Sequence, residues 1–196
     1  MKTLLIISSL LLLVVACGSR EVTRTATDTV TDLSGYWNDT DARQVANSIV
    51  DQCLNGRWFD THSRNEDSRV RNIPVVVVGG VRNQSTEHIN VDVFMSEIER
   101  SLLNSGEFQI AAGGRERDEV RGERGDQSVF ASPATAAEFG REIGANYVLT
   151  GTVNSIEDRE GSTRVIFYQV NLEMIDVETA LKVWMGSTEI KKVIEW

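Results

Sequence analysis

The fold of this chain is decided by the stretch Ile73-Pro74-Val75-Val76-Val77-Val78. Five of these six residues are Ile or Val, and no polar side chain interrupts them, which is typical of a strand buried on both faces. Pro74 stands at the start, where a missing backbone N–H costs least. The sequence predicts that Gly79 and Gly80 end the strand and that the polar residues 82–88 follow as a loop.

Two amphipathic helices flank this strand. The first is predicted to begin at a cap within residues 38–40 and to run to about Leu54. Its apolar residues repeat at spacings of three and one, which places on one helical face Ala42, Val45, Ala46, Ile49, Val50, Cys53 and Leu54. The second helix is predicted between a cap at Asn90 and Gly106, with an apolar face formed by Val91, Phe94, Met95, Ile98 and Leu102.

The rest of the chain supplies further strands and one more helix. Strands are predicted at residues 107–112, 146–156, 163–175 and 182–194. Short turns join the last three, so these must be antiparallel, whereas the helices between the earlier strands suit crossover connections. Ser132-Pro133 predicts a helix that runs to about Ile143, because Pro is favoured at the first helical position.

Two segments between these elements are polar. Residues 60–72 are predicted to form a loop, and residues 113–128 a solvated surface segment of mixed charge with room for an irregular helix. The predicted order is therefore α-β-α-β-α-β-β-β. The fold class is α/β (α+β), with a single mixed sheet flanked by helices.

The N-terminus carries the pattern of a secretory signal. Lys2 is followed by an apolar run from Leu4 to Val15, which is too short to span a bilayer comfortably. A small residue then precedes Cys17, and this arrangement resembles the signal of a bacterial lipoprotein. The resemblance implies that the chain is cut before Cys17 and that Cys17 carries acyl chains. The alternative is a secreted protein in which a Cys falls at this place by chance.

The chain thus divides into three expected parts. These are a lipoprotein signal peptide at 1–16, a lipidated Cys with a flexible polar tether at 17–34, and a globular domain at 35–196. Gly18 follows the lipidated Cys in place of the Asp that signals inner-membrane retention in enteric-type sorting, which favours the outer membrane.

The charge of the chain argues against nucleic acid as a partner. The chain contains 20 Lys and Arg against 29 Asp and Glu, a net charge of −9, and loss of the signal with its one charged residue, Lys2, makes this −10. An acidic domain repels phosphate backbones. If Cys17 carries lipid, Cys53 has no partner for an internal disulfide, and its place on an apolar helix face predicts a small buried side chain.

The sequence contains no recognisable catalytic or metal-binding constellation. Its two histidines, His62 and His88, fall in predicted loops, and a site built from His62, Glu66 and Asp67 matches no metal-binding spacing. The Gly pair at 113–114 follows a strand but lacks the spacing and the Lys of a phosphate-binding loop. We therefore expect no enzyme activity, no metal and no cofactor.

Four tryptophans are candidates for packing or for partner contact. Trp37 and Trp184 are predicted to pack in the core. Two tryptophans have two possible roles: Trp58, in a predicted loop, and Trp196, the last residue. Each is either an exposed contact for a partner or a side chain that packs at the edge of the core, and the sequence leaves both possibilities open.

Several stretches occur in a recognisable order and spacing along the chain. They are Gly35-Tyr36-Trp37-Asn38, Val76-Val77-Val78-Gly79-Gly80-Val81-Arg82-Asn83-Gln84-Ser85, His88-Ile89-Asn90, Leu102-Leu103-Asn104-Ser105-Gly106-Glu107-Phe108, Gly140-Arg141-Glu142-Ile143-Gly144-Ala145-Asn146-Tyr147-Val148-Leu149, Leu172-Glu173-Met174-Ile175-Asp176 and Val183-Trp184-Met185-Gly186. Together they resemble the penicillin-binding protein activator LpoB family from about residue 35 to the end.

This resemblance implies both a fold and a function. It implies a fold like the N-terminal domain of TolB, and an outer-membrane lipoprotein that faces the periplasm. Such a protein docks on a non-catalytic domain of a bifunctional peptidoglycan synthase, a class A penicillin-binding protein, and stimulates glycan polymerisation and cross-linking. By position, the loop Arg82, Asn83, Gln84 and Ser85 is the candidate partner contact; its alternative role is to satisfy its own turn geometry.

The tether departs from this family pattern. Well-known members carry a long Pro-rich tether, whereas residues 17–34 contain no Pro and reach about 50–60 Å when extended. Other functions therefore stay open. They are an envelope secretion or assembly lipoprotein related to the curli secretion factor, an envelope binding module that activates nothing, and an envelope hydrolase.

Overall fold

The computed structural model of the protein describes residues 22–63, 72–130 and 144–196. The chain divides into two units, Met1–Val30 and Thr31–Trp196. All of the described helices and strands belong to the second unit.

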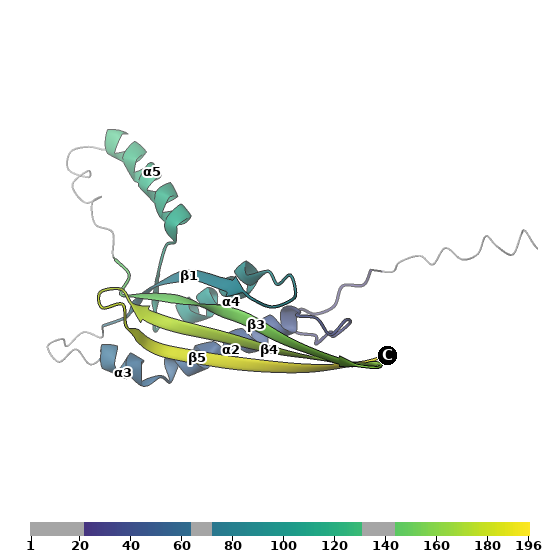
Figure 1. Ribbon diagram of the computed structural model, residues 1–196. Helices are drawn as coiled ribbons and strands as arrows, with labels where there is room; N and C mark the ends of the chain where they lie inside the picture. The colour runs from purple at the N-terminus through teal and green to yellow at the C-terminus, as the bar shows by residue number, and fades with distance from the viewer. Residues whose placement is uncertain (1–21, 64–71, 131–143) are drawn as a thin grey trace, which may run out of the picture. The chain divides into compact units, whose positions relative to one another are not determined.

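A five-stranded mixed sheet forms the centre of this unit (Figure 1). Its strands, in the order β2-β1-β3-β4-β5, are β2 (Gln109–Ala111), β1 (Val75–Asn83), β3 (Tyr147–Glu160), β4 (Thr163–Asp176) and β5 (Lys182–Glu195). β1 pairs in parallel with both β2 and β3, whereas β3, β4 and β5 are antiparallel neighbours. The predicted mixed sheet is therefore confirmed, with the Val-rich strand β1 inside it.

Two helices cover one face of the sheet. The described helices are α2 (Asp39–Leu54), α3 (Arg57–Ser63), α4 (Val91–Asn104) and α5 (Gly114–Phe130). α4 contacts β1 and β2, while α2 contacts α4 and β5. Of the candidates at 38–40, Asn38 is the N-cap of α2, and Asn90 is the N-cap of α4, as the sequence predicts. Among the described helices, none has the length and apolar character needed to cross a bilayer.

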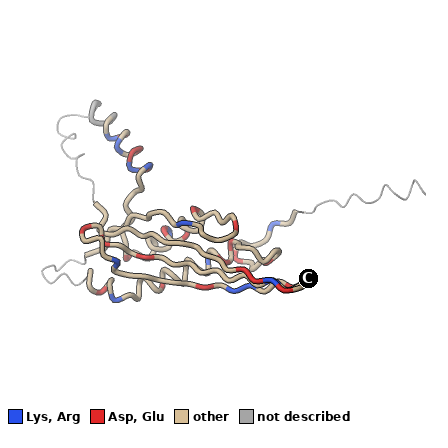
Figure 2. The backbone as a smooth tube through the Cα atoms, viewed as in Figure 1, with Lys and Arg blue, Asp and Glu red and all other residues tan. Residues whose placement is uncertain are grey.

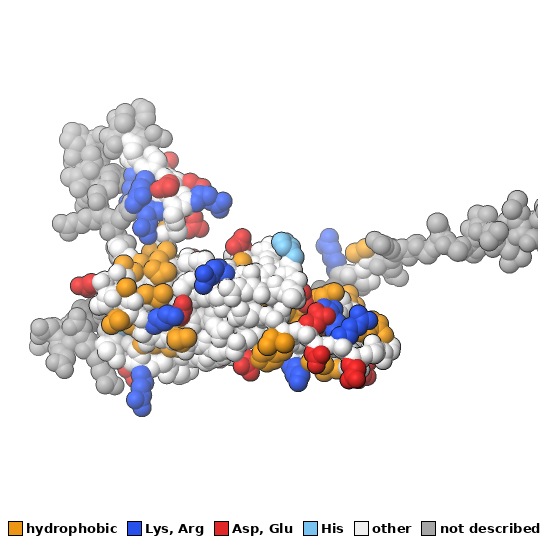
Figure 3. Space-filling model, in the orientation of Figure 1, with side chains coloured by type: hydrophobic (Ala, Val, Ile, Leu, Met, Phe, Trp, Pro, Cys, Tyr) orange, Lys and Arg blue, Asp and Glu red, His pale blue; other side chains and the backbone are white. Residues whose placement is uncertain are grey.

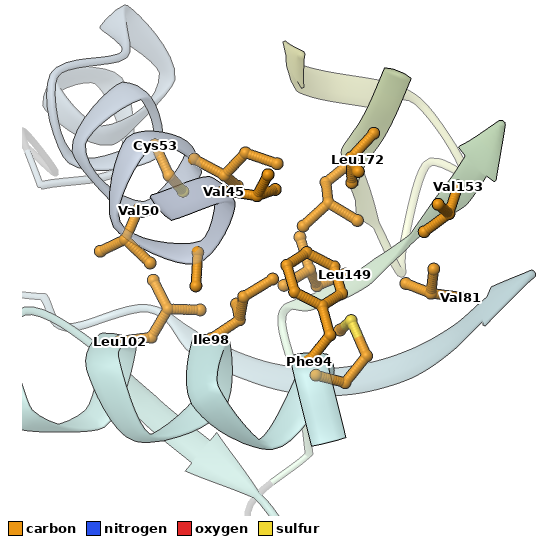
Figure 4. Close-up of a cluster of buried hydrophobic side chains, with 14 of the residues drawn as sticks. Val45, Val50, Cys53, Val81, Phe94, Ile98, Leu102, Leu149, Val153 and Leu172 are labelled. Atoms are coloured by element: carbon orange, nitrogen blue, oxygen red, sulfur yellow. The ribbon is translucent and has the colours of Figure 1, made fainter. Parts of the chain in front are cut away.

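The core lies between these two helices and the sheet (Figure 4). The predicted apolar face of α2 is buried from Ala42 to Cys53, and α4 buries Phe94, Met95, Ile98 and Leu102. From the sheet, alternate residues of β3 and β4 point into the same core, among them Leu149, Val153 and Leu172. Alternate residues of the strands and one face of α2 thus pack together in a single apolar layer.

The structure corrects the predicted end of β1. The strand does not stop at Gly79 and Gly80 but continues to Asn83, with a shift of register against β3 between Val78 and Val81. Gly79 is required at this irregularity, because a Cβ there would lie 2.9 Å from the carbonyl oxygen of Leu149. Two adjacent glycines are as typical of the end of a strand as of a bulge within it. Here β1 continues past them because its pairing with β3 resumes at Val81.

Two polar segments also differ from expectation. The predicted loop at 60–72 begins with the end of a helix, α3, whose Trp58 and Phe59 pack on Phe108. The mixed-charge stretch forms the regular helix α5, along which acidic and basic residues interleave (Figure 2). The helix predicted at 132–143 lies outside the described residues.

Candidate docking surface

The loop after β1 is fixed to the sheet at both of its ends. The backbone N–H of Gln84 donates to the carbonyl oxygen of Val153 at 2.7 Å, and the N–H of Thr86 donates to Ser155 Oγ at 3.0 Å. Both acceptors lie on β3. Because its backbone is already ordered, this loop would lose little conformational entropy on binding a partner.

The four candidate contact residues divide into two roles. Asn83 and Ser85 hold the loop together: Asn83 Nδ2 donates to the carbonyl oxygen of Glu87 at 2.7 Å, and Asn83 Oδ1 accepts from Ser85 N and Oγ. Arg82 and Asn83 are the last two residues of β1 rather than part of the loop, and the side chains of Arg82 and Gln84 are exposed. Arg82 and Gln84 are thus available to a partner, while Asn83 and Ser85 maintain the shape of the loop.

A half-buried carboxylate, Glu87, ties the loop to the core. Its two oxygens accept from different elements: Oε1 from the hydroxyl of Tyr168 at 2.5 Å, and Oε2 from the backbone N–H of Trp37 at 3.1 Å. Burial raises the pKa of Tyr168, and its hydrogen bond to Glu87 raises it further. Sequence reasoning missed Glu87, since one acid in a polar loop carries no sign of partners 50 and 81 residues away.

A groove of about 550 Å³ runs beside this loop, between residues 36–42 and residues 86–94. Its lining is largely apolar and includes Tyr36, Trp37, Ala42, Ile89, Val93 and Phe94. The Trp37 ring makes edge contacts with Phe94 and Tyr168, at centroid separations of 6.2 and 5.5 Å. The groove floor is therefore part of the core.

A second groove lies on the sheet face that points away from α2 and α4. It has a volume of about 520 Å³, and its lining includes Gly80, Arg82, Thr150, Thr152, Asn171, Glu173 and Met185. Hydrophobic side chains gather toward both ends of the face in view in Figure 3, with few of them between. Arg82 thus belongs to the rim of a depression whose lining mixes polar and apolar groups.

A buried charge cluster joins the start of α2 to β5. The Lys192 ammonium lies 2.7 Å from Asp41 Oδ2 and 2.8 Å from Asp32 Oδ1, and it donates to the carbonyl oxygen of Tyr36 at 3.1 Å. Asp41 also accepts from the N–H of Asn38, which completes the capping box of α2. Burial alone would lower the pKa of Lys192, but its hydrogen bonds to the two aspartates outweigh this and raise that pKa.

Of the titratable groups considered as chemical candidates, Cys53 and His62 make contacts inside the domain. Burial raises the pKa of the Cys53 thiol to about 12, so this free cysteine is an inert core side chain, as predicted. His62 Nδ1 lies 2.8 Å from the Tyr147 hydroxyl, and His88 is exposed. Within residues 22–63, 72–130 and 144–196, no group of three or more His, Cys, Asp or Glu is placed to hold a metal ion. Cys17, Glu66 and Asp67 lie outside the described residues.

The tryptophans separate into core and surface residues. Trp37 and Trp184 pack in or against the core, as predicted. Of the two alternatives for Trp58, the structure supports packing in the core, since its side chain is buried and its Nε1–H donates to the carbonyl oxygen of Cys53. Trp196 is 67% exposed and lies against the guanidinium of Arg159.

We expect the stability of the domain to fall as the pH drops below about 6.5, the ordinary pKa of His. Burial lowers the pKa of His62, although the charge of Asp176 opposes this shift, and Nε2 is buried without a hydrogen-bond partner among the described residues. A lowered folded-state pKa means that stability is complete above the unfolded-state value and is lost as the pH falls toward the folded-state value.

The measurement is urea denaturation between pH 7.5 and 5. His62→Gln should flatten the curve of unfolding free energy against pH, while the matched control His88→Gln, at an exposed position, should leave it unchanged. A slope that persists in His62→Gln would contradict the assignment.

An ordered loop beside two of the surface grooves gives this domain a surface on which a partner can dock. A model of the family described as peptidoglycan-synthase activator LpoB matches residues 41–190. The chain therefore belongs to this family, whose members are regulatory activators and not enzymes. The predicted family and the absence of enzyme function are confirmed by this match.

Several solved structures are similar to this chain at low sequence identity. The LpoB C-terminal domain from Escherichia coli is 17% identical, with 76% of this chain and 98% of that chain covered and a TM-score of 0.45. The NMR structure of E. coli LpoB is 15% identical, with 94% and 86% covered and a TM-score of 0.43. Lipoprotein GNA1162 from Neisseria meningitidis is 16% identical, with 61% and 83% covered and a TM-score of 0.40. No curated protein matches the chain in sequence.

Proposed function

We propose that this protein is a lipid-anchored envelope protein that binds and activates a class A penicillin-binding protein, and so promotes glycan polymerisation and cross-linking. The observation that carries the proposal is the match of residues 41–190 to a family of peptidoglycan-synthase activators. An activator of this kind needs no catalytic group of its own. It acts by binding one conformation of the synthase more tightly than another, which shifts the population toward the active state.

The proposed contact with the synthase centres on Arg82 and Gln84. Both side chains are exposed, and Arg82 forms no ion pair with another described residue. The hydrogen bonds of Asn83, Ser85 and Glu87 fix the loop beside them. An Arg on a preformed surface is suited to bidentate contact with a partner carboxylate, which favours an acidic patch on the synthase.

The proposed location is the outer membrane, with the domain facing the periplasm. The support for it is the sequence pattern around Cys17, with the acyl chains carried on that residue and Gly18 behind it. A tether of residues 17–34 reaches about 50–60 Å. This reach limits how far from its membrane the domain can meet a synthase, which favours a partner domain that projects toward the anchor.

The experiment is a glycan-polymerisation assay with soluble residues 18–196, which retain every core residue that the structure describes. Each class A synthase of the same organism is measured with and without the protein, and a reaction without synthase is the control. We expect faster polymerisation that saturates with added protein. No change with any synthase would overturn the proposal and move the function to secretion or to another envelope partner.

A further inference from the structure

β5 is an edge strand of unusual length. It is 14 residues long, and β4 is its one neighbour in the sheet (Figure 1). Its other edge carries backbone N–H and C=O groups that another strand can pair with. Natural edge strands are commonly short or covered, so a long open edge raises the question of what pairs with it.

One side chain identifies which residues of β5 face the open edge. Gln52 on α2 bonds the backbone of Ser187 twice, donating from Nε2 to its carbonyl oxygen at 3.0 Å and accepting from its N–H at 3.2 Å. The N–H and C=O of Ser187 therefore point away from β4. Alternate residues share this orientation, so those of Glu189, Lys191, Val193 and Glu195 point the same way.

The segment before α2 lies beside the end of β5, where residues 32–36 and 191–196 line a pocket of about 780 Å³. Residues 32–36 lie against Lys192 and Ile194, whose side chains point to the helix-covered face of the sheet. No backbone hydrogen bond joins residues 32–36 to β5 within the described part of the chain. Beyond Ser187, the outward groups of β5 thus have no partner among the described residues.

The side chains along this edge are complementary in charge to the same side chains of a second, antiparallel copy. Lys191 and Glu195 are both exposed, neither forms an ion pair with another described residue, and Val193 stands between them with 59% of its surface exposed. If two copies pair antiparallel about a two-fold axis at Val193, each Lys191 lies opposite the Glu195 of the other copy, and the two Val193 side chains meet. Charged residues gather at this end of the strands (Figure 2).

The geometry points to a homodimer formed by antiparallel pairing of β5 with β5 of a second copy, centred on Val193. This register uses the outward-pointing residues 191, 193 and 195 and stops short of Ser187, where Gln52 already occupies the edge. A register centred near residue 190 would instead place the partner strand against Gln52. The pairing joins two five-stranded sheets into one of ten strands by an isologous contact.

The dimer goes beyond the proposed function and does not depend on it. Arg82 lies on β1, which β3 and β4 separate from β5, so pairing at β5 leaves the proposed docking surface free. Two copies would then present two docking surfaces, which raises the effective concentration of the second once the first is bound.

The first test is disulfide trapping with the full chain in detergent micelles. Directly opposed residues in a hydrogen-bonded antiparallel pair have Cα atoms about 5.5 Å apart, within the range of a disulfide. Val193→Cys should therefore form a covalent dimer with copper phenanthroline as the oxidant. Met185→Cys is the matched control, because Met185 is similarly exposed at 65% on the same strand but away from the axis. The parent chain, with Cys17 and Cys53, gives the background.

The second test is reversal of charge, read by light scattering of the full chain over a concentration series. Lys191→Glu should weaken self-association about tenfold, since each pair becomes a repulsion between carboxylates. The swapped variant Lys191→Glu/Glu195→Lys should restore it. A monomer at every concentration, or Val193→Cys trapping no better than Met185→Cys, would overturn the proposal, as would a swapped variant that associates no better than Lys191→Glu.

Discussion

Lys192→Met should destabilise the domain by about 3 kcal/mol, because it leaves a buried carboxylate without its counter-charge. Only 11% of the Lys192 side chain and 7% of the Asp41 side chain are exposed. The methylene stem of Met replaces that of Lys, so the packing changes little and the effect reports the lost charge. Urea denaturation followed by circular dichroism measures this difference as a lower midpoint at unchanged slope.

Two further variants test the cause of that loss. Lys192→Met/Asp41→Asn should recover a large part of the stability, because Asn removes the unpaired charge and still accepts from the backbone of Asn38. Lys182→Met removes an ammonium from the same strand, where its ion pair with Glu173 is more exposed, and should cost less than about 1 kcal/mol. Equal losses in Lys182→Met and Lys192→Met would show that burial of the pair is not the reason.

The Lys192 cluster also illustrates what periodicity in a sequence cannot reveal. Asp32 and Lys192 are 160 residues apart, and the sequence around each residue predicts only an ordinary charged side chain on the surface. The apolar faces of α2 and α4 were predictable because three- and four-residue spacing encodes a helix face directly. A contact between a helix cap and a distant strand has no comparable local signal.

The same distinction explains the errors at β1 and α3. The sequence predicts β1 as a strand from its run of Val residues, but whether Gly79 and Gly80 end or bend it depends on pairing with β3, some 70 residues later. α3 is short, and its helical form coincides with the packing of Trp58 and Phe59 on Phe108. Tertiary contacts decide such short segments, which carry too little periodicity of their own.

The side chains of the proposed contact residues differ in what they bond, and the sequence carries no sign of this difference. The resemblance placed them together at 82–85, and the structure divides them according to hydrogen bonding. Asn83 and Ser85 are loop-forming residues because their side chains bond within the loop, whereas Arg82 and Gln84 present their side chains to solvent. Roles of this kind depend on which way each side chain points along a strand and its turn, and a register shift at Gly79 and Gly80 is enough to change that.

Arg82→Glu should raise the protein concentration needed for half-maximal stimulation of the synthase at least tenfold, a loss of about 1.4 kcal/mol in binding. The reason is that a contact suited to a carboxylate becomes a repulsion between like charges, which also reduces the association rate at low salt. The fold should be unaffected, since Arg82 forms no ion pair with another described residue. Polymerisation assays over a concentration series, repeated at two ionic strengths, measure the effect.

The matched control is Arg57→Glu, which makes the same charge change at an exposed position on α3. It should stimulate the synthase as the parent chain does, so a general effect of added negative charge is separated from a local one. Gln84→Ala should give a smaller loss in the same direction, because it removes a neutral contact rather than creating a repulsion. If Arg82→Glu stimulates normally with an unchanged denaturation midpoint, Arg82 lies outside the docking surface, and the apolar groove beside Trp37 becomes the next surface to test by substitution at the exposed Val93.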